Sequence, residues 1–154
     1  MTLSFKESCL ASGLMAAALS ATTSLAAPKP FTLDLGHAYV GWEIDHFAFS
    51  NTVGQFRVFD GDFLIDEERL ENSLIRFVIQ ADSIDSNHVG RDNHLRAEDM
   101  LNVATYPTIK FVSTSIDMQS DDRGEITGDL TFMGSTQPFS VSYTHLTLPT
   151  ICSV

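Results

Sequence analysis

Hydrophobic and polar residues alternate along much of this chain. The clearest run lies within residues 37–47, where one face of an extended strand carries Ala38, Val40, Trp42, Ile44 and His46. Residues 72–81, 108–116 and 125–134 repeat the pattern, with apolar or small faces made of Ile75, Phe77, Ile79 and Ala81, of Ile109 and Phe111, and of Ile126, Gly128, Leu130 and Phe132. A period of two is typical of half-buried antiparallel strands.

Residues 54–66 alternate with one interruption. Phe56 and Val58 share the first face, but after Asp60-Gly61 the apolar positions move to Phe63 and Ile65. A shift of one residue at a glycine predicts a β-bulge at this point.

One segment, Arg91–Leu101, has the pattern of a helix. Asp92 is suited to cap its start, and Leu95, Met100 and Leu101 supply an apolar side. Pro107 then marks the entry to the next strand. The dense charge of this segment therefore indicates a capped helix beside the strands, and we expect Arg91 to pair with a carboxylate such as Asp85.

Many short strands with close turns and a single helix predict an all-β fold, either a sandwich or a closed barrel. Periodicity does not separate these two architectures. The inward faces are large and aromatic, which suits either a packed core or a lipid-lined cavity.

The N-terminus has the features of an export signal. An apolar run follows Lys6, and small residues precede Ala26, so we expect residues 1–26 to be removed and the protein to be periplasmic. The run is too short and too interrupted for stable membrane insertion. The net charge of −11 argues against nucleic-acid binding, which requires a basic surface. The two cysteines, Cys9 and Cys152, leave the folded part without a disulfide.

Candidate catalytic and metal-binding residues do not converge in the sequence. His88 and His94 are six positions apart and no cysteine pair accompanies them, so we expect no metal and no cofactor. A nucleophile elbow of the Gly-x-Ser-x-Gly type is missing, and Asp92 and His94 are badly spaced to face each other on a helix. The sequence thus predicts a protein that is not an enzyme.

Two further histidines accompany the first strand. His46 continues the face of Trp42 and Ile44, where it is either a hydrogen-bonded core residue or a polar contact for a lipid headgroup. His37 lies on the other face, and we expect it to pair locally with Asp34.

Several separated motifs resemble the YceI-like family. They are Asp34 with His37, the strand ending at His46, Ser83–Asp85, Arg91-Asp92-x-His94-Leu95, Tyr106–Ile109 before Phe111, and Gly128–Thr131 with Gly134 and Pro138. The resemblance runs from about Phe31 to Val141. It implies an exported protein with an antiparallel lipocalin-like β-barrel that binds polyisoprenoid or other long-chain lipids.

The last residues do not resemble the family's closing strands. We therefore expect residues 27–142 to form an incomplete barrel with one short helix and open edge strands, and residues 143–154 to be a tail foreign to the family.

The resulting hypothesis is a periplasmic lipid carrier whose ligand is an isoprenoid or fatty-acyl chain. The expected wall of its cavity is Val40, Trp42, Ile44, Phe56, Val58, Ile75, Phe77, Ile79, Phe111, Leu130 and Phe132. His46, Arg91 and His94 are the expected headgroup contacts. The alternative is a ligand-free structural or stress-related envelope domain with a filled core. The sequence leaves the oligomeric state open, including a homodimer.

Overall fold

The computed structural model describes residues 27–144. The expected signal peptide, residues 1–26, and the tail from residue 145 onward lie outside the described residues. Among the described residues, no helix is both long and apolar enough to cross a membrane.

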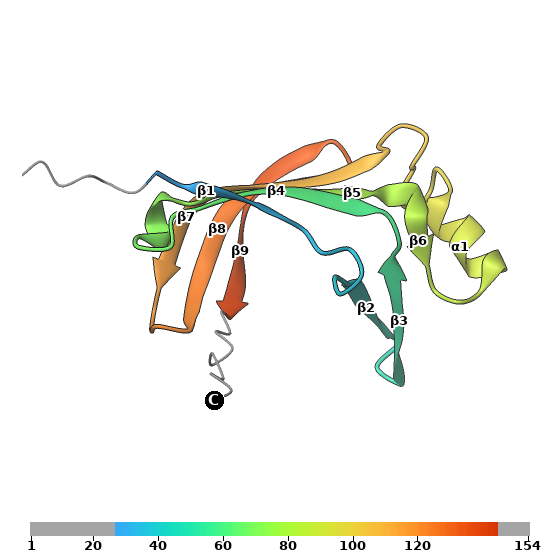
Figure 1. The fold of residues 1–154 in the computed structure, drawn as a ribbon. Coiled ribbons are helices and arrows are strands. Elements are labelled where there is room, and N and C mark those ends of the chain that lie inside the picture. Colours follow the sequence, from blue (N-terminus) through green and yellow to red (C-terminus); the bar gives the residue numbers. More distant parts are fainter. Residues whose placement is uncertain (1–26, 145–154) are drawn as a thin grey trace, which may run out of the picture.

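Two antiparallel sheets make up the fold (Figure 1). The larger sheet has the strand order β1 (Lys29–Thr32), β4 (Phe59–Ile65), β5 (Leu74–Gln80), β7 (Thr108–Met118), β8 (Arg123–Phe132) and β9 (Ser135–Thr144). The smaller sheet has the order β2 (Val40–His46), β3 (Ser50–Phe56) and β6 (Ile84–Asp85). Short 3-10 turns, η1 (Leu70–Asn72) and η2 (Ala81–Ser83), and one helix, α1 (Val89–Arg96), complete it.

The sheets curve around a common concave side without closing into a barrel over the described residues. In Figure 1 the β2–β3 hairpin descends on one side of this concavity and the ends of β8 and β9 descend on the other. The predicted all-β class with a single α-helix is confirmed, and the fold is a lipocalin-like barrel that is open along one side.

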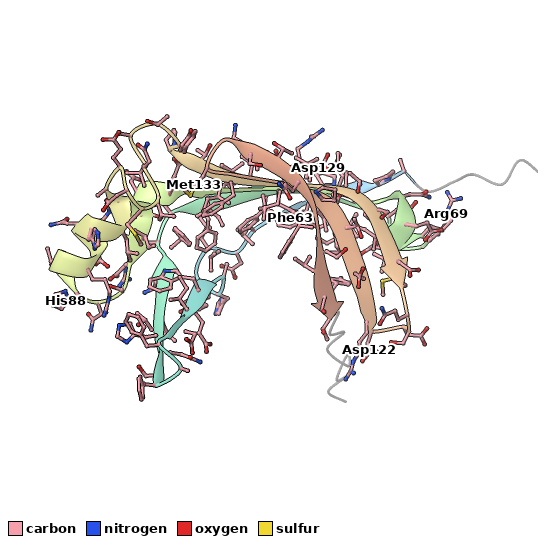
Figure 2. All side chains as sticks on the ribbon, turned by 180° about the vertical axis from the view of Figure 1, so that it is seen from behind. Phe63, Arg69, His88, Asp122, Asp129 and Met133 are labelled. Atoms are coloured by element: carbon pink, nitrogen blue, oxygen red, sulfur yellow. The ribbon has the colours of Figure 1, made fainter. Side chains whose placement is uncertain are left out.

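The alternating faces predicted for β5, β7 and β8 are confirmed by their register. Phe77 pairs with Phe111 and Phe111 with Leu130, which sets these inner faces side by side. Figure 2 shows Phe63 pointing into the concave side, while Asp129 lies on the convex side. Within residues 27–144 the buried apolar residues are few: Phe56, Ala81, Ile84, Ile116 and Ile126.

The bulge predicted at Asp60-Gly61 is wrong. β4 pairs with β5 in an unbroken register from Phe59 to Leu64, and Phe59, not Val58, begins its inner face. The change of face occurs because the chain leaves the smaller sheet after Phe56 and enters the larger one at Phe59. Val58 lies between the two strands and is 55% exposed.

A register shift does occur on β7, opposite β8, between Ser113 and Ser115. It brings both Ser113 and Ile116 into buried positions. The Ser113 hydroxyl accepts a hydrogen bond from the Ile75 backbone N–H at 2.9 Å, so the buried hydroxyl has a partner.

The helix begins earlier and ends earlier than predicted. His88 is its N-cap, because its Nδ1 accepts a hydrogen bond from the Arg91 N–H at 3.1 Å. Asp92 lies inside the helix, is buried, and is therefore not the cap. Residues 97–106 continue as turns closed by backbone hydrogen bonds such as Leu101 N–H to Leu95 O at 3.0 Å.

Candidate ligand-binding site

The concave side of the larger sheet forms an apolar pocket of about 460 Å³, here called the sheet pocket. Strands β4, β5, β7, β8 and β9 supply its walls, since each contributes its inner face. Its lining is Phe63, Ile65, Leu70, Ser73, Ile75, Phe77, Phe111, Ile116, Ile126, Leu130, Phe139, Val141 and Tyr143. Burial raises the pKa of the Tyr143 phenol above its ordinary value.

A second apolar pocket of about 440 Å³, the helix pocket, lies between the β2–β3 hairpin and the segment that follows α1. Its lining is Trp42, Glu43, Ile44, Phe56, Ile84, Leu95, Asp99, Met100, Leu101, Ile109, Phe132 and Met133. The two carboxylates in this set are exposed, so the wall itself is apolar.

A hollow of about 310 Å³ lies beside both pockets. It shares Leu130 and Phe139 with the sheet pocket and Phe132 with the helix pocket. The two pockets and this hollow, which follow the concave side, are together called the trough. Apolar clefts of this size are the usual form of small-molecule sites.

Glycines on the strands keep the trough open. A Cβ atom on Gly54 would lie closer than 3.0 Å to the Trp42 ring, and one on Gly128 would lie equally close to the Phe111 ring. The two rings therefore rest on bare backbone instead of standing up into the cavity. Trp42 and Gly54 are direct cross-strand partners, which explains the contact.

Trp42 also carries an unusual polar group. Its Nε1–H is buried and has no hydrogen-bond partner among the described residues. Buried donors are nearly always paired, and an unpaired one costs free energy. The indole ring lines the helix pocket, but its Nε1 atom is covered by neighbouring protein atoms.

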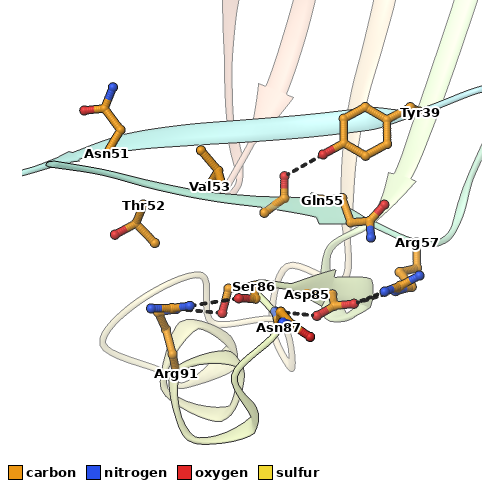
Figure 3. A pocket seen from close by; sticks show the side chains of 11 residues that line it. Tyr39, Asn51, Thr52, Val53, Gln55, Arg57, Asp85, Ser86, Asn87 and Arg91 are labelled. Carbon is orange, nitrogen blue, oxygen red and sulfur yellow. Dashed lines mark hydrogen bonds and ion pairs between the residues drawn. The ribbon is translucent and has the colours of Figure 1, made fainter.

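A polar pocket of about 550 Å³ lies outside the trough, between β3 and the start of α1 (Figure 3). Arg91 donates from Nε to the Ser86 hydroxyl at 2.7 Å and from Nη2 to the Ser86 carbonyl at 2.8 Å. Arg57, and not Arg91, forms the ion pair with Asp85, which corrects the predicted partner of Arg91. Arg91 forms no ion pair with a carboxylate of residues 27–144.

The carboxylates of this region are fixed by hydrogen bonds. The Ser86 hydroxyl and backbone N–H both donate to Asp92 Oδ1, and chiefly the hydroxyl lowers the pKa of Asp92 below its ordinary range. The Asn87 N–H and the Arg57 side chain likewise lower the pKa of Asp85. Both carboxylates stay ionised at neutral pH, and their hydrogen bonds hold the chain in place between β6 and α1.

A model of the YceI-like domain matches residues 31–149. The chain belongs to the YceI-like family. A UPF0312 protein of Pseudomonas putida is 39% identical over 139 residues, which are 90% of this chain and 72% of that protein. Protein YceI of Escherichia coli O157:H7 is 38% identical over 136 residues, which are 88% of this chain and 71% of that protein.

Solved structures of similar fold include BcnA of Burkholderia cenocepacia, with a TM-score of 0.68 and 23% identity over 72% of this chain and 69% of that one. The YceI protein of Campylobacter jejuni follows with a TM-score of 0.59 and 28% identity, over 73% of this chain and 66% of that one. This YceI-like chain thus spans about two thirds of the length of these structures.

Most residues predicted for the cavity wall line the trough of this YceI-like chain. The sheet pocket contains Ile75, Phe77, Phe111 and Leu130, and the helix pocket contains Trp42, Ile44, Phe56 and Phe132. Val40 and Ile79 lie on the same strand faces, half-buried, but line neither pocket. Val58 lies outside both pockets because the chain changes sheets there.

The predicted headgroup contacts do not come together. His46 is exposed at the end of β2 and touches the Phe47 ring edge-on, with ring centroids 4.8 Å apart, so it is not a core residue. Arg91 faces the polar pocket. His94 is exposed and lies 3.4 Å from Asp99 Oδ2. The pairing predicted for His37 is confirmed, with Nδ1 2.8 Å from Asp34 Oδ2, and this contact lowers the pKa of Asp34.

The sequence reasoning missed the contribution of β9. Phe139, Val141 and Tyr143 line the sheet pocket, and their spacing of two was a usable signal. Gly134 to Pro138 is typical of a turn in composition, but the turn is confined to Met133 and Gly134 and the strand begins at Ser135. Pro138 is tolerated there because β9 is an edge strand.

Within residues 27–144, no group of three or more His, Cys, Asp or Glu side chains is placed to hold a metal ion. The trough walls are mainly hydrocarbon and aromatic side chains, which suit an apolar ligand.

Proposed function

We propose that this YceI-like protein carries a long-chain lipid, an isoprenoid or fatty-acyl chain, in the trough formed by the sheet pocket and the helix pocket. The observation that carries the proposal is the apolar lining of the neighbouring pockets that make up the trough. Membership of the YceI-like family supports it, since the resemblance to that family implies binding of polyisoprenoid or other long-chain lipids.

The physical basis of binding is burial of hydrocarbon. Each CH₂ group removed from water contributes about 0.8 kcal/mol, so two or three isoprene units supply enough for roughly micromolar affinity after the cost of association. An elongated trough suits an extended chain better than a compact ligand.

The headgroup of the proposed ligand is expected to remain near the rim. His46 lies at the exposed end of β2, the strand that carries Trp42 and Ile44 of the helix pocket. At the β6–α1 end His94 is exposed, whereas Arg91 faces the polar pocket outside the trough and donates to Ser86. The proposal includes export to the periplasm and no catalytic activity, in keeping with the N-terminal sequence pattern and the missing catalytic constellation.

The rival function is a ligand-free structural domain with a solid core. The inner aromatic residues, Phe77 and Phe111 among them, are only partly buried and face open volume. Because the barrel is open along one side, a ligand cavity and an unclosed core would both leave these rings partly exposed, and the variants below separate the two functions.

Organic extraction of the natively purified protein, followed by mass spectrometry, tests the proposal. We expect a long-chain lipid in stoichiometric amount, and its reproducible absence would remove the carrier function.

A matched pair of variants separates the two functions. Phe77→Ala is expected to weaken lipid binding about tenfold with a stability loss below ~3 kcal/mol, because the ring lines a cavity wall. Val112→Ala, on the convex face of the neighbouring strand, is the control and leaves lipid content unchanged. A loss of ~3–5 kcal/mol in Phe77→Ala with no effect on lipid content would favour the filled-core domain.

A further inference from the structure

The tip of the β2–β3 hairpin presents two phenylalanines to solvent. Phe49 is 92% exposed and Phe47 is 79% exposed, more than any other large hydrophobic residue of the described chain. The ring contact of Phe47 is with its neighbour His46, at the tip itself. Prominent exposed apolar groups of this kind mark interaction sites.

The backbone of the tip holds the rings outward at an energetic cost. Phe47 and Ala48 both have left-handed conformations, with φ of 55° and 59°. The turn is closed by Phe49 N–H to His46 O at 3.2 Å and by Ala48 N–H to Asp45 Oδ1 at 2.9 Å. A bulky residue in this conformation is strained, and such strain gathers at functional positions.

The tip carries little charge for a strongly acidic protein. Residues 46–56 contain no Asp, Glu, Lys or Arg, and the charged group at the turn is the Asp45 carboxylate, which accepts the Ala48 N–H, whereas the whole chain has a net charge of −11. An aromatic tip with so little charge is complementary to a lipid interface without net charge. The acidic remainder is repelled by an anionic surface over the Debye length, about 8–10 Å at moderate salt.

The hairpin leads directly from this tip to the trough. Ile44 and Trp42 follow His46 on the same face of β2, and both line the helix pocket. In Figure 1 the hairpin projects away from the larger sheet, on the side where the concavity opens. The tip and the helix pocket are therefore two ends of one strand face.

We propose that Phe47 and Phe49 insert into the interfacial region of a zwitterionic bilayer and thereby place the mouth of the trough against the membrane. A lipid then passes along the inner face of β2 without crossing water. The transfer step rests on the proposed lipid-carrier function, whereas insertion of the tip does not.

Sedimentation with sucrose-loaded phosphatidylcholine vesicles tests the insertion, using the purified full-length chain. The test variant is Phe47→Asn combined with Phe49→Ser, because Asn accepts the left-handed backbone of the turn. The control is Leu64→Ser combined with Val112→Ser, two 38%-exposed residues on the convex face. Circular dichroism and the thermal midpoint verify that both fold.

We expect the wild type and the control to bind these vesicles, and the tip variant to bind at least about tenfold more weakly. Adding phosphatidylglycerol is expected to reduce binding at low salt, and salt is expected to restore it. Equal binding by the tip variant, or no binding by the wild type, overturns the proposal. A change of oligomeric state in the tip variant without a change in vesicle binding overturns it in favour of contact with a second copy.

A soluble probe distinguishes failure of the tip from failure of the carrier function. Trp42 is the single tryptophan of the chain and lines the helix pocket, so its fluorescence reports binding of farnesol. We expect the tip variant to bind farnesol like the wild type but to take up lipid from vesicles more slowly. Vesicle binding through the tip without farnesol binding would retain insertion and reject the carrier function. Farnesol binding with unaltered uptake by the tip variant would reject the tip's role.

Discussion

The β6–α1 end of the molecule and the trough are built in opposite ways. At the β6–α1 end, polar groups satisfy one another: Asp92 accepts from Ser86, Arg91 donates to Ser86, and Arg96 donates to the carbonyls of Asp82 and Ile84 at 2.6 Å each. In the trough, large apolar side chains are half-buried and face empty volume. One region fixes the chain by hydrogen bonds, and the other leaves apolar surface free for a ligand.

This difference separates stability from binding. Damage to the β6–α1 end should lower the free energy of unfolding while the ligand affinity of the folded molecules stays nearly constant. Damage to the trough should change the ligand affinity more than the fold. Four measurements test this division, beginning with the largest expected effect.

Arg96→Ala should lower the free energy of unfolding by about 2–3 kcal/mol, because two charge-assisted hydrogen bonds to backbone carbonyls are lost. Urea denaturation measures this loss, and farnesol affinity at low temperature should remain within about twofold. Arg96→Lys is the control and should recover part of the stability, since lysine reaches one carbonyl at a time. An unchanged midpoint for Arg96→Ala would show that this end does not fix the fold.

Gly128→Ala should reduce both stability and ligand capacity. The new methyl group would lie closer than 3.0 Å to the Phe111 ring and to the Val112 carbonyl oxygen, so the ring must rise into the sheet pocket. Overpacking of this kind costs about 1–3 kcal/mol. We expect a shorter or less bulky lipid in the extract by mass spectrometry. Combining the change with Phe111→Leu should restore the capacity, and failure to do so would argue against ring displacement.

Acidification should weaken the β6–α1 end through Asp92. Its folded-state pKa lies below the ordinary value of 3.8, so the carboxylate stabilises the fold fully above that value. This contribution is lost as the pH falls from about 4 through the folded-state pKa. Asp92→Asn should therefore be less stable than the wild type at pH 7 and lose less of its remaining stability on acidification to pH 3.

Asp121→Asn is the control for this pH series, because no described hydrogen bond engages the Asp121 carboxylate. Its loss of stability with acid should match that of the wild type. Parallel pH curves for the wild type and Asp92→Asn would contradict the role assigned to Asp92.

Trp42→Phe should have the smallest effect on stability, within about 1 kcal/mol, because lost ring area is offset by removal of an unpaired buried donor. Because the Nε1 atom is covered by protein, affinity for a lipid alcohol and for a hydrocarbon of equal length should fall to a similar extent, measured by competition with a fluorescent lipid. A larger loss for the alcohol would show that the indole N–H reaches the ligand.

The strands and their inner faces were predictable because alternation is a local property. Trp42, Phe77 and Phe111 were assigned to the correct side from spacing alone. The change of face near Val58 was wrongly assigned to a bulge at Asp60-Gly61. The spacing of apolar residues shows that the face changes but not why, and the cause is that the chain passes from the smaller sheet to the larger one. Asp92 was a plausible cap by residue type, but Ser86 recruits its carboxylate through a tertiary contact that spacing does not reveal.

The wall of the site was less predictable than the strands. Phe139 and Val141 required recognition that the turn after β8 is only two residues long. Ile79 and Val40 share the correct face but fall outside the pockets, since a pocket is defined by the curvature of neighbouring strands. The family resemblance supplied the ligand class, which the alternation pattern alone left open between a filled core and a cavity.

Gly54 and Gly128, each lying under an aromatic ring, have a consequence for ligand choice. The aromatic residues provide the chemistry of the wall, but the glycines decide how far each ring stands from it. A single methyl group at either position changes the cross-section available to a lipid while leaving every aromatic residue in place. The two positions thus limit how wide a ligand can be. Relatives with a larger residue at either position are expected to accept narrower lipids than relatives with glycine there.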